Sequence, residues 1–454
     1  MSYFLPLGGA EEIGATCYYL NIDNTGIILD CGTHPRKKGM DALPQFSLIK
    51  QRQVDVALIS HAHQDHIDSL PYLVQQHPYI RVLTTPQTRA VAELTLHNSV
   101  SILQEQLKDE TAFRPYTHDE VDLLIQSVEW RAYKEEFLLE GYRSNSIHPI
   151  TASFHDAGHI LGSAGILLKQ NEKKIFFTGD INLEKQALLT AAELPQEKID
   201  KLILECTHGA TDSVSLPPWW SEAERFTTIA NKIIQQGGSI LIPVFALGKL
   251  QEVMTTLWLM MEKGRLSHVD IFTGGIGKKI SAVYDKNRYV VPRINQEFEV
   301  ESIPQKNLFE VEHIEDFFHT PCIVLASSGM IVEGTRSFKL AQRWLTQHKS
   351  AIFTVGYMDT ETPGYKIARA KQGDTIQFTE MSEPQQVHCA IEKFRFSAHS
   401  RREGLLEIVR RLQPEKVILV HGDTNAVDSL GYSILNNFPA TKVHVAEVGK
   451  QIEL

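Results

Sequence analysis

Leu58-Ile59-Ser60-His61-Ala62-His63-Gln64-Asp65-His66-Ile67-Asp68 places three histidines and an aspartate within six residues. The residues before them are apolar and partly β-branched, which predicts a buried strand that ends at the histidines. Packing does not explain so dense a group of coordinating side chains. Histidine with carboxylate is a typical ligand set for zinc, with manganese or iron as alternatives where several oxygen ligands take part. Because side chains diverge along an extended segment, His61 and His63 can bind one ion while Asp65 and His66 reach a second about 3.5–4 Å away. The stretch therefore predicts a two-metal hydrolytic centre.

The composition is that of a globular enzyme. The chain has 454 residues, of which 43% are hydrophobic and 22% charged, and this length suits two or three domains of about 100–200 residues each. No run approaches the roughly 18 apolar residues of a membrane span, and the start of the chain lacks the pattern of a signal peptide. We therefore expect a cytoplasmic protein without membrane contact. The formal net charge of −10 argues against unspecific binding of nucleic acid by the whole surface and leaves a local basic groove open.

Several further apolar runs end at a polar side chain. Asp30 follows one such run, and we expect it to orient a histidine rather than to bind metal directly. The same pattern ends at Asp180, at Glu205 and at His421, while His159 lies in a glycine-flanked loop. Apolar residues at helical spacing predict covering helices over 87–108 and 118–137.

A second pattern of alternating strands and helices begins after Pro217-Pro218. Predicted strands at 239–245, 269–273 and 322–326 alternate with helical segments, which favours a separate parallel sheet. The sequence therefore predicts an α/β protein whose first domain, 1–208, is interrupted by an insert over 209–381 and completed by 382–454.

The ligand pattern resembles a known superfamily. Asp30, the string His61-Ala62-His63-Gln64-Asp65-His66, His159 and Asp180 resemble the successive motifs of the metallo-β-lactamase superfamily. Glu205, His399 in Phe-Ser-Ala-His-Ser and His421 in Leu-Val-His-Gly-Asp are similar to three further motifs of the β-CASP nucleases. The likeness is strongest to the RNA-processing branch that includes the endonuclease subunit of the cleavage and polyadenylation specificity factor. It implies a metallo-β-lactamase αββα sandwich with an inserted β-CASP α/β domain.

The resemblance also implies roles for individual residues. It assigns one of two Zn²⁺ ions to His61, His63 and His159, the other to Asp65, His66 and His421, and a bridging role to Asp180. His399 would act as a general acid or hydrogen-bond donor, oriented by Glu205, with Asp65 and Asp180 as the catalytic carboxylates. Ser327, Ser328 and Ser397 would contact the substrate, although a helix cap is the alternative for the first two.

One loop departs from the family pattern. Relatives usually have Glu-Ser-Thr-Tyr-Gly where this chain has Glu205-Cys206-Thr207-His208-Gly209, which leaves the substrate-facing edge of that loop open. His34, His155 and His208 lie beside the motifs, but seven ligands are already assigned, so we expect none of the three to bind metal.

The resemblance favours a zinc-dependent ribonuclease that hydrolyses phosphodiester bonds in single-stranded RNA, as an endonuclease or as a 5′ exonuclease. A DNA nuclease of the same fold is an alternative, which His421 disfavours because DNA-repair members normally lack a histidine at that motif. A small-molecule hydrolase of the lactamase or thioesterase type is disfavoured by the insert, which would cover the metals. A non-catalytic RNA-processing subunit is disfavoured by the complete ligand set. Homodimerisation, protein partners and the RNA target remain open.

Overall fold

The computed structural model describes residues 2–106, 115–142, 146–379 and 382–454. The chain forms two compact units. The first comprises Met1–Glu184, Ala191–Ser215 and Ala398–Leu454, and the second comprises Lys185–Thr190 and Leu216–Ser397.

Two seven-stranded sheets form the centre of the first unit. In the first sheet β1, β2 and β3 are antiparallel and β3 to β6 are parallel. Its order is β22 (Ile452–Glu453), β1 (Tyr3–Gly8), β2 (Cys17–Ile22), β3 (Thr25–Leu29), β4 (Val56–Leu58), β5 (Arg81–Thr84) and β6 (Glu129–Trp130). The second sheet has the order β21 (Lys442–Val445), β20 (Lys416–Val420), β11 (Lys201–Glu205), β10 (Lys173–Phe177), β9 (Ala164–Gln170), β8 (Ile150–Asp156) and β7 (Phe137–Leu138).

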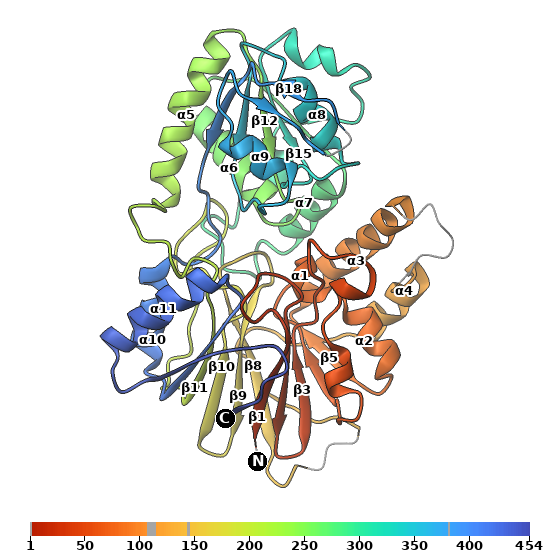
Figure 1. Ribbon diagram of the computed structural model, residues 1–454, viewed down its shortest axis with the longest axis vertical. Coiled ribbons are helices and arrows are strands. Elements are labelled where there is room, and N and C mark those ends of the chain that lie inside the picture. The colour runs from red at the N-terminus through yellow and green to blue at the C-terminus, as the bar shows by residue number, and fades with distance from the viewer. Residues whose placement is uncertain (1, 107–114, 143–145, 380–381) are drawn as a thin grey trace. The chain divides into compact units, whose positions relative to one another are not determined.

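The main core of this unit lies between the two sheets. Leu29 and Leu58 of the first sheet and Ile166, Phe177 and Ile203 of the second are buried in one cluster. Helices cover the outer faces: α2 (Leu70–Gln76), α3 (Pro86–Gln106) and α4 (His118–Ser127) lie along the first sheet, and α10 (Arg402–Leu412) and α11 (Thr424–Asn437) along the second (Figure 1). Burial of apolar faces on both sides of each sheet explains the four layers. The predicted αββα sandwich is confirmed.

Helix α4 is shorter than the sequence predicted. It begins with a capping box, in which Thr117 Oγ1 accepts the N–H of Glu120 and the Glu120 carboxylate accepts that of Thr117. It ends at Ser127, because Glu129–Trp130 pairs with β5 as a strand, so the predicted continuation to 137 was wrong. For the preceding helix, residues 107 and 108 of the prediction lie outside the described residues.

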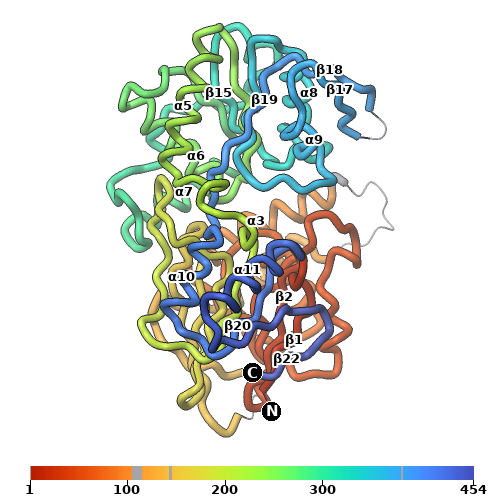
Figure 2. Tube along the Cα trace, turned by 60° about the vertical axis from the view of Figure 1, so that its left-hand side comes forward, coloured from red at the N-terminus to blue at the C-terminus, as the bar shows by residue number. Residues whose placement is uncertain are grey.

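The second unit is built on a parallel sheet, as the sequence predicted for the insert, and this sheet has six strands. The order is β14 (Lys306–Asn307), β13 (Asp270–Thr273), β15 (Cys322–Ala326), β12 (Ile240–Pro243), β16 (Ala351–Thr354) and β19 (Ala390–Lys393). The helices are α5 (Trp219–Gln235), α6 (Lys249–Glu262), α7 (Ile276–Lys286), α8 (Arg336–Trp344) and α9 (Pro363–Arg369). The short strands β17 (Thr375–Ile376) and β18 (Gln385–Gln386) pair with each other beside α8 and α9 (Figure 2). Ile376 of β17 packs against the apolar cluster to which α8 and α9 contribute.

The second unit does not coincide with the range 209–381 given for the insert: its main part begins at Leu216, so residues 209–215 belong to the first unit, and it continues to Ser397. Strand β19 lies beside β16 and brings residues 390–393 into this sheet, and residue 381 itself lies outside the described residues. Lys185–Thr190 joins the unit because the buried Glu252 carboxylate on α6 accepts the main-chain N–H groups of Ala187, Leu188 and Leu189 at 2.7, 2.7 and 3.1 Å. Three hydrogen bonds to one buried carboxylate explain why this short segment belongs to the second unit and not to the first.

All five cysteines are free and buried. Among the residues that the structure describes, no helix combines the length and the apolar character needed to cross a bilayer.

Candidate metal centre

The histidine string begins where β4 ends. His61 and His63 lie in the extended segment after the strand, and the short helix α1 (Gln64–Ile67) starts directly after His63 and carries Asp65 and His66. The main chain of α1 is held from outside, because Asp65 O accepts the N–H of Thr16 and His66 O that of Cys31. A Cβ atom on Gly32 would lie 1.8 Å from the Asp65 carbonyl oxygen, so only glycine fits beside this turn.

The first ligand group consists of His61, His63, His159 and Asp180. His63 Nδ1 lies 3.2 Å from His61 Nε2 and 3.1 Å from His159 Nε2. Asp180 Oδ2 lies 3.6 Å from the Nε2 atoms of both His61 and His159. In tetrahedral coordination at 2.0–2.1 Å, nitrogen ligands of zinc stand about 3.3 Å apart. The spacing of these donor atoms therefore fits a single metal ion.

The second ligand group consists of Asp65, His66 and His421. Asp65 Oδ2 lies 3.4 Å from His421 Nε2 and 3.8 Å from His66 Nε2. Asp180 also reaches this group, with Oδ2 3.4 Å from His66 Nε2 and Oδ1 3.1 Å from His421 Nδ1. His66 Nε2 and Asp180 Oδ1 are buried and make no hydrogen bond of acceptable geometry. Buried ligand atoms that lie this close to one another without forming hydrogen bonds are consistent with a cation bound between them.

The protonation states suit metal binding. Burial lowers the pKa of His61 and of His159 well below the usual value. The charge of His66 lowers the pKa of His61 further, and the charge of His399 does the same for His159, so both imidazoles are neutral. Burial alone would raise the pKa of Asp180, but the charges of His421 and His66 outweigh it and hold that pKa well below the usual range. Neutral imidazoles and ionised carboxylates are the forms that bind metal. His66 differs, because Asp180 and Asp65 outweigh its burial and raise its pKa well above the usual value, so this imidazole has to release a proton when it binds a metal ion.

Asp30 lies against His66, as the sequence predicted. Its Oδ2 atom is 2.8 Å from His66 Nδ1, which leaves His66 Nε2 for the ligand cluster. Asp30 also accepts the N–H of Ser60 at 2.6 Å and its hydroxyl at 2.7 Å. The sequence analysis missed Ser60, whose Oγ is also 2.9 Å from His61 Nδ1, and its sole signal is its place directly before the histidine string.

His159 is oriented through its other ring nitrogen. It lies in the loop between β8 and β9, and its Nδ1 is 2.8 Å from the carbonyl oxygen of Ala398. Nδ1–H therefore donates to this carbonyl, and Nε2 faces His63. A carbonyl oxygen has no sequence signal, so this partner of His159 was not predictable.

His399 and Glu205 form a hydrogen-bonded pair beside the ligands. His399 Nδ1 lies 3.0 Å from Glu205 Oε1, and its Nε2 lies 3.9 Å from Asp180 Oδ2. The buried Glu205 carboxylate also accepts the N–H groups of Ile181 and Thr207 at 3.2 and 2.8 Å. Burial alone would raise the pKa of Glu205, but the charge of His399 and its hydrogen bond hold it below the usual value. The donor atoms of Asp180, Glu205 and His399 also lie close enough together to hold an ion. Because the Glu205 carboxylate accepts the Nδ1–H of His399, we assign it to this hydrogen bond and not to a metal ion.

The loop after Glu205 contributes two more neighbours of the site. Thr207 Oγ1 lies 3.3 Å from His421 Nδ1, a contact that the sequence analysis missed. The ring of His208 lies 5.9 Å from that of His399, centroid to centroid, at an interplanar angle of 86°. Neither His208, His34 nor His155 belongs to a potential ligand group among the described residues.

The three predicted substrate-binding serines belong to the second unit. Ser328 Oγ accepts the N–H of Val332 at 3.1 Å, so this hydroxyl caps a turn after β15. Ser327 precedes it, and its carbonyl oxygen accepts the N–H of Ser337. Ser397 is half-buried at the end of this unit. A role of these serines in substrate binding stays a prediction.

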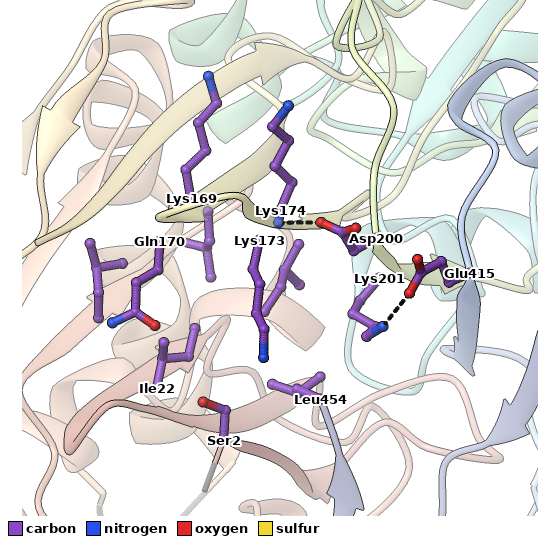
Figure 3. A pocket seen from close by; sticks show the side chains of 13 residues that line it. Ser2, Ile22, Lys169, Gln170, Lys173, Lys174, Asp200, Lys201, Glu415 and Leu454 are labelled. Atoms are coloured by element: carbon purple, nitrogen blue, oxygen red, sulfur yellow. Dashed lines mark hydrogen bonds and ion pairs between the residues drawn. The ribbon is translucent and has the colours of Figure 1, made fainter. Parts of the chain in front are cut away.

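A cavity of about 120 Å³ lies at the opposite ends of the strands that carry the ligands (Figure 3). Lys173 and Lys201, which begin β10 and β11, line it, and Lys201 forms an ion pair with Glu415 at 3.2 Å. Asp180 and Glu205 lie at the carboxyl ends of the same strands, where ligands of parallel strands usually bind. The cavity is therefore not part of the candidate metal centre.

Three family models match the chain in succession. Residues 19–207 match a metallo-beta-lactamase superfamily domain, residues 250–367 a Beta-Casp domain, and residues 384–445 a Zn-dependent metallo-hydrolase RNA specificity domain.

Curated relatives match over nearly the whole chain. Cleavage and polyadenylation specificity factor 73 of Drosophila melanogaster is 31% identical over 449 residues, which cover 96% of this chain and 62% of the relative. Endoribonuclease YSH1 of Saccharomyces cerevisiae is 29% identical over 464 residues, which cover 97% of this chain and 57% of the relative. The chain thus spans about three fifths of the length of these relatives.

A solved structure shares the fold. A protein of unknown function from Enterococcus faecalis superimposes with a TM-score of 0.59 at 13% sequence identity, over 100% of both chains.

Proposed function

Because the chain belongs to the metallo-β-lactamase superfamily and carries its β-CASP domain, we propose that it is a zinc-dependent ribonuclease that hydrolyses phosphodiester bonds in single-stranded RNA. One observation carries the proposal: Asp180 contacts both ligand groups, and the His399–Glu205 pair lies beside it. Two adjacent ions and a nearby acid–base group are what hydrolysis of a phosphodiester requires.

The ligand set supports zinc as the metal. His61, His63 and His159 offer three imidazole nitrogens, and the second group adds two more imidazoles, whereas harder ions such as magnesium prefer oxygen ligands. When bound, two such ions would offset negative charge on the phosphate oxygens and lower the pKa of a water molecule. Manganese remains the alternative.

The chain's own residues account for the movement of protons. His399 donates Nδ1–H to Glu205, and a second proton would sit on Nε2, the ring nitrogen that faces Asp180. The buried carboxylate of Glu205 stabilises the imidazolium that results. His399 can therefore hold a proton at Nε2 and pass it to the leaving oxygen of the substrate.

Support for RNA as the substrate comes from the comparisons. Residues 384–445 match a domain described by its RNA specificity, and relatives along the whole chain are named endoribonucleases. These names favour internal cleavage, with 5′ exonucleolytic cleavage as the alternative. A DNA nuclease, a small-molecule hydrolase and a non-catalytic subunit remain the competing functions, and homodimerisation and the cytoplasmic location remain predictions.

The test compares matched RNA and DNA oligonucleotides of one sequence, incubated with protein loaded with a defined amount of zinc. We expect cleavage of RNA, including a circular RNA that offers no end, and loss of cleavage in Asp180→Ala. Circular RNA separates internal cleavage from degradation that starts at a 5′ end. Preference for DNA, or hydrolysis of a lactam or thioester without cleavage of RNA, would contradict the proposal.

A further inference from the structure

The hydroxyl of Ser99, on helix α3, forms hydrogen bonds to both ends of the short helix α1. It accepts a hydrogen bond from Nε2 of Gln64 at 3.1 Å and donates one to Oδ2 of Asp68 at 2.7 Å. Gln64 is the first residue of α1 and Asp68 follows its last, so the metal ligands Asp65 and His66 lie between the two bonds. We propose that Ser99 is a positioning residue, which fixes α1 so that the ligands it carries lie where the second ligand group requires them. The inference rests on the proposed function only for its kinetic test, because its metal-binding test needs no RNA.

Helix α1 depends on its surroundings for its orientation. It has four residues, and much longer helices are only marginally stable by themselves in water. The carbonyl oxygens of residues 64–66 accept the main-chain N–H groups of Thr33, Thr16 and Cys31 at 3.0, 2.9 and 2.7 Å. The bonds from Ser99 instead hold the side chains at the two ends of α1, and they come from α3, which lies against it (Figure 1). Because two separate parts of the unit hold α1, it cannot pivot about either of them.

The hydrogen bond between Ser99 and Asp68 is buried. Ser99 is 4% exposed and Asp68 is 5% exposed, and the buried Tyr116 is a further hydrogen-bonding neighbour of Ser99. Among the described residues, Oδ1 of Asp68 has no hydrogen-bond partner. Removal of the Ser99 hydroxyl would therefore leave a buried carboxylate with fewer bonds, which is costly. We expect the end of α1 to shift in response, and His66 lies only two residues before Asp68.

Such a shift should affect the two ligand groups unequally. The first ligand group takes no residue from α1, whereas the second takes two of its three ligands, Asp65 and His66, from this helix. Distances between zinc and its ligands vary by only about ±0.2 Å in well-formed sites. A small displacement of α1 should therefore weaken the second site more than the first.

The metal-binding test titrates metal-free protein with zinc against a competing chelator and compares Ser99→Ala, Asp68→Ala and Asp68→Asn. The second site is identified by its loss in His421→Ala. We expect Ser99→Ala to weaken this site by about 3- to 30-fold, less than the 10–100-fold typical of a partner that bonds a ligand directly, and to change the first site less. Asp68→Ala should also weaken the second site, whereas Asp68→Asn keeps an oxygen that accepts the hydroxyl of Ser99 and should bind zinc as the wild type does.

Ser101→Ala is the matched control. Ser101 lies on the same helix, is exposed, and donates its hydroxyl to the carbonyl oxygen of His97 at 3.0 Å, so its removal should change neither site. An unchanged second site in Ser99→Ala would overturn the proposal. An equal loss at both sites, together with a lower melting temperature of the metal-free protein, would show a merely structural role and overturn it as well. Equal losses in Asp68→Asn and Asp68→Ala would assign the effect to the charge of the carboxylate, which also contradicts the proposal.

The kinetic test measures RNA cleavage over a range of zinc concentrations. For Ser99→Ala, the zinc concentration that gives half-maximal cleavage should rise by the factor found in the titration, and excess zinc should restore the wild-type rate. A rate that stays low at saturating zinc would contradict a role through the metal site. A wild type that binds two zinc ions and cleaves no RNA would refute the proposed function, while the titration still decides the role of Ser99.

Discussion

Nδ1 of His399 lies 3.0 Å from Oε1 of Glu205, although 194 positions separate the two residues in the sequence. Two main-chain N–H groups also hold the Glu205 carboxylate, so it cannot turn away from the imidazole. A fixed acceptor at Nδ1 places the proton of the neutral imidazole on that atom, while Nε2 faces Asp180 at 3.9 Å.

Replacing His399 with alanine should separate catalysis from metal binding. His399 lies outside both ligand groups that we assign to metal, so the variant should keep its zinc and its affinity for RNA while the cleavage rate falls about 10²–10⁴-fold. Glu205→Gln should lower the rate less, and the double variant should be no slower than His399→Ala, because Glu205 acts through His399. Rates from single-turnover assays and zinc content from mass spectrometry check this, and a zinc-depleted His399→Ala protein would make His399 a ligand.

Replacing Asp180 with alanine should empty both metal sites together. Asp180 is the carboxylate within 3.6 Å of donor atoms in both ligand groups, so its loss removes a ligand from each. Zinc content and cleavage should fall in parallel, whereas Asp41→Ala, which removes an exposed carboxylate from the same unit, should change neither. Retention of two zinc ions by Asp180→Ala would show that this residue does not bridge them.

Asp30→Asn should weaken one metal site selectively. The Asp30 carboxylate accepts the Nδ1–H of His66, and loss of such a partner typically costs 10–100-fold in metal affinity. We expect that loss for the ion bound by Asp65, His66 and His421, and a smaller one for the other ion, because Asp30 reaches His61 only through the hydroxyl of Ser60. Titration with a competing chelator should resolve two affinities, and an equal decrease in both would contradict the assignment.

The stability of the second unit should fall as the pH rises from about 4.5 to about 7. Burial raises the pKa of Glu252 from 4.5 to about 7, against the opposing effect of the N–H groups of Leu188, Leu189 and Ala187. In this window the unfolded chain releases the proton that the folded chain retains, so increasing pH favours unfolding, by on the order of 3 kcal/mol in total. Melting curves at several pH values should show this slope in the wild type, a smaller slope in Glu252→Gln, and an unchanged slope in Glu262→Gln, which alters an exposed residue on the same helix. Equal pH dependence of the melting temperature in all three proteins would contradict the assignment of this effect to Glu252.

Residues of the site that lie close together in the sequence were easier to predict than those that lie far apart. His61, His63, Asp65 and His66 could be predicted from the sequence because four ligands fall within six residues. His159, Asp180 and His421 are single residues in separate segments, and only the resemblance to a known family assigned them as metal ligands. Ser60 and the carbonyl oxygen of Ala398 were missed, because hydroxyl and main-chain groups carry no ligand pattern of their own.

The prediction of the fold was correct where the hydrophobic pattern extends over many residues. It failed where tertiary contacts determine the end of a helix or the boundary of a unit. The separate parallel sheet follows from apolar runs, whereas the two packed sheets of the αββα sandwich were expected from the resemblance to the superfamily. The end of α4 at Ser127 depends on pairing of Glu129–Trp130 with β5, which helical spacing does not reveal. The assignment of Lys185–Thr190 to the second unit depends on hydrogen bonds to Glu252, 63 to 65 positions away.

The contact between Asp65 and His421 spans 356 positions of the chain, and this separation has a consequence for biosynthesis. At about 5–20 residues per second, the ribosome needs roughly 20–70 s to proceed from the first of these residues to the second. During that interval the nascent chain already carries the histidine string but lacks a ligand of the second group. Incomplete chains therefore cannot assemble the full centre, and the proposed cleavage of RNA is among the last properties that a newly made molecule acquires.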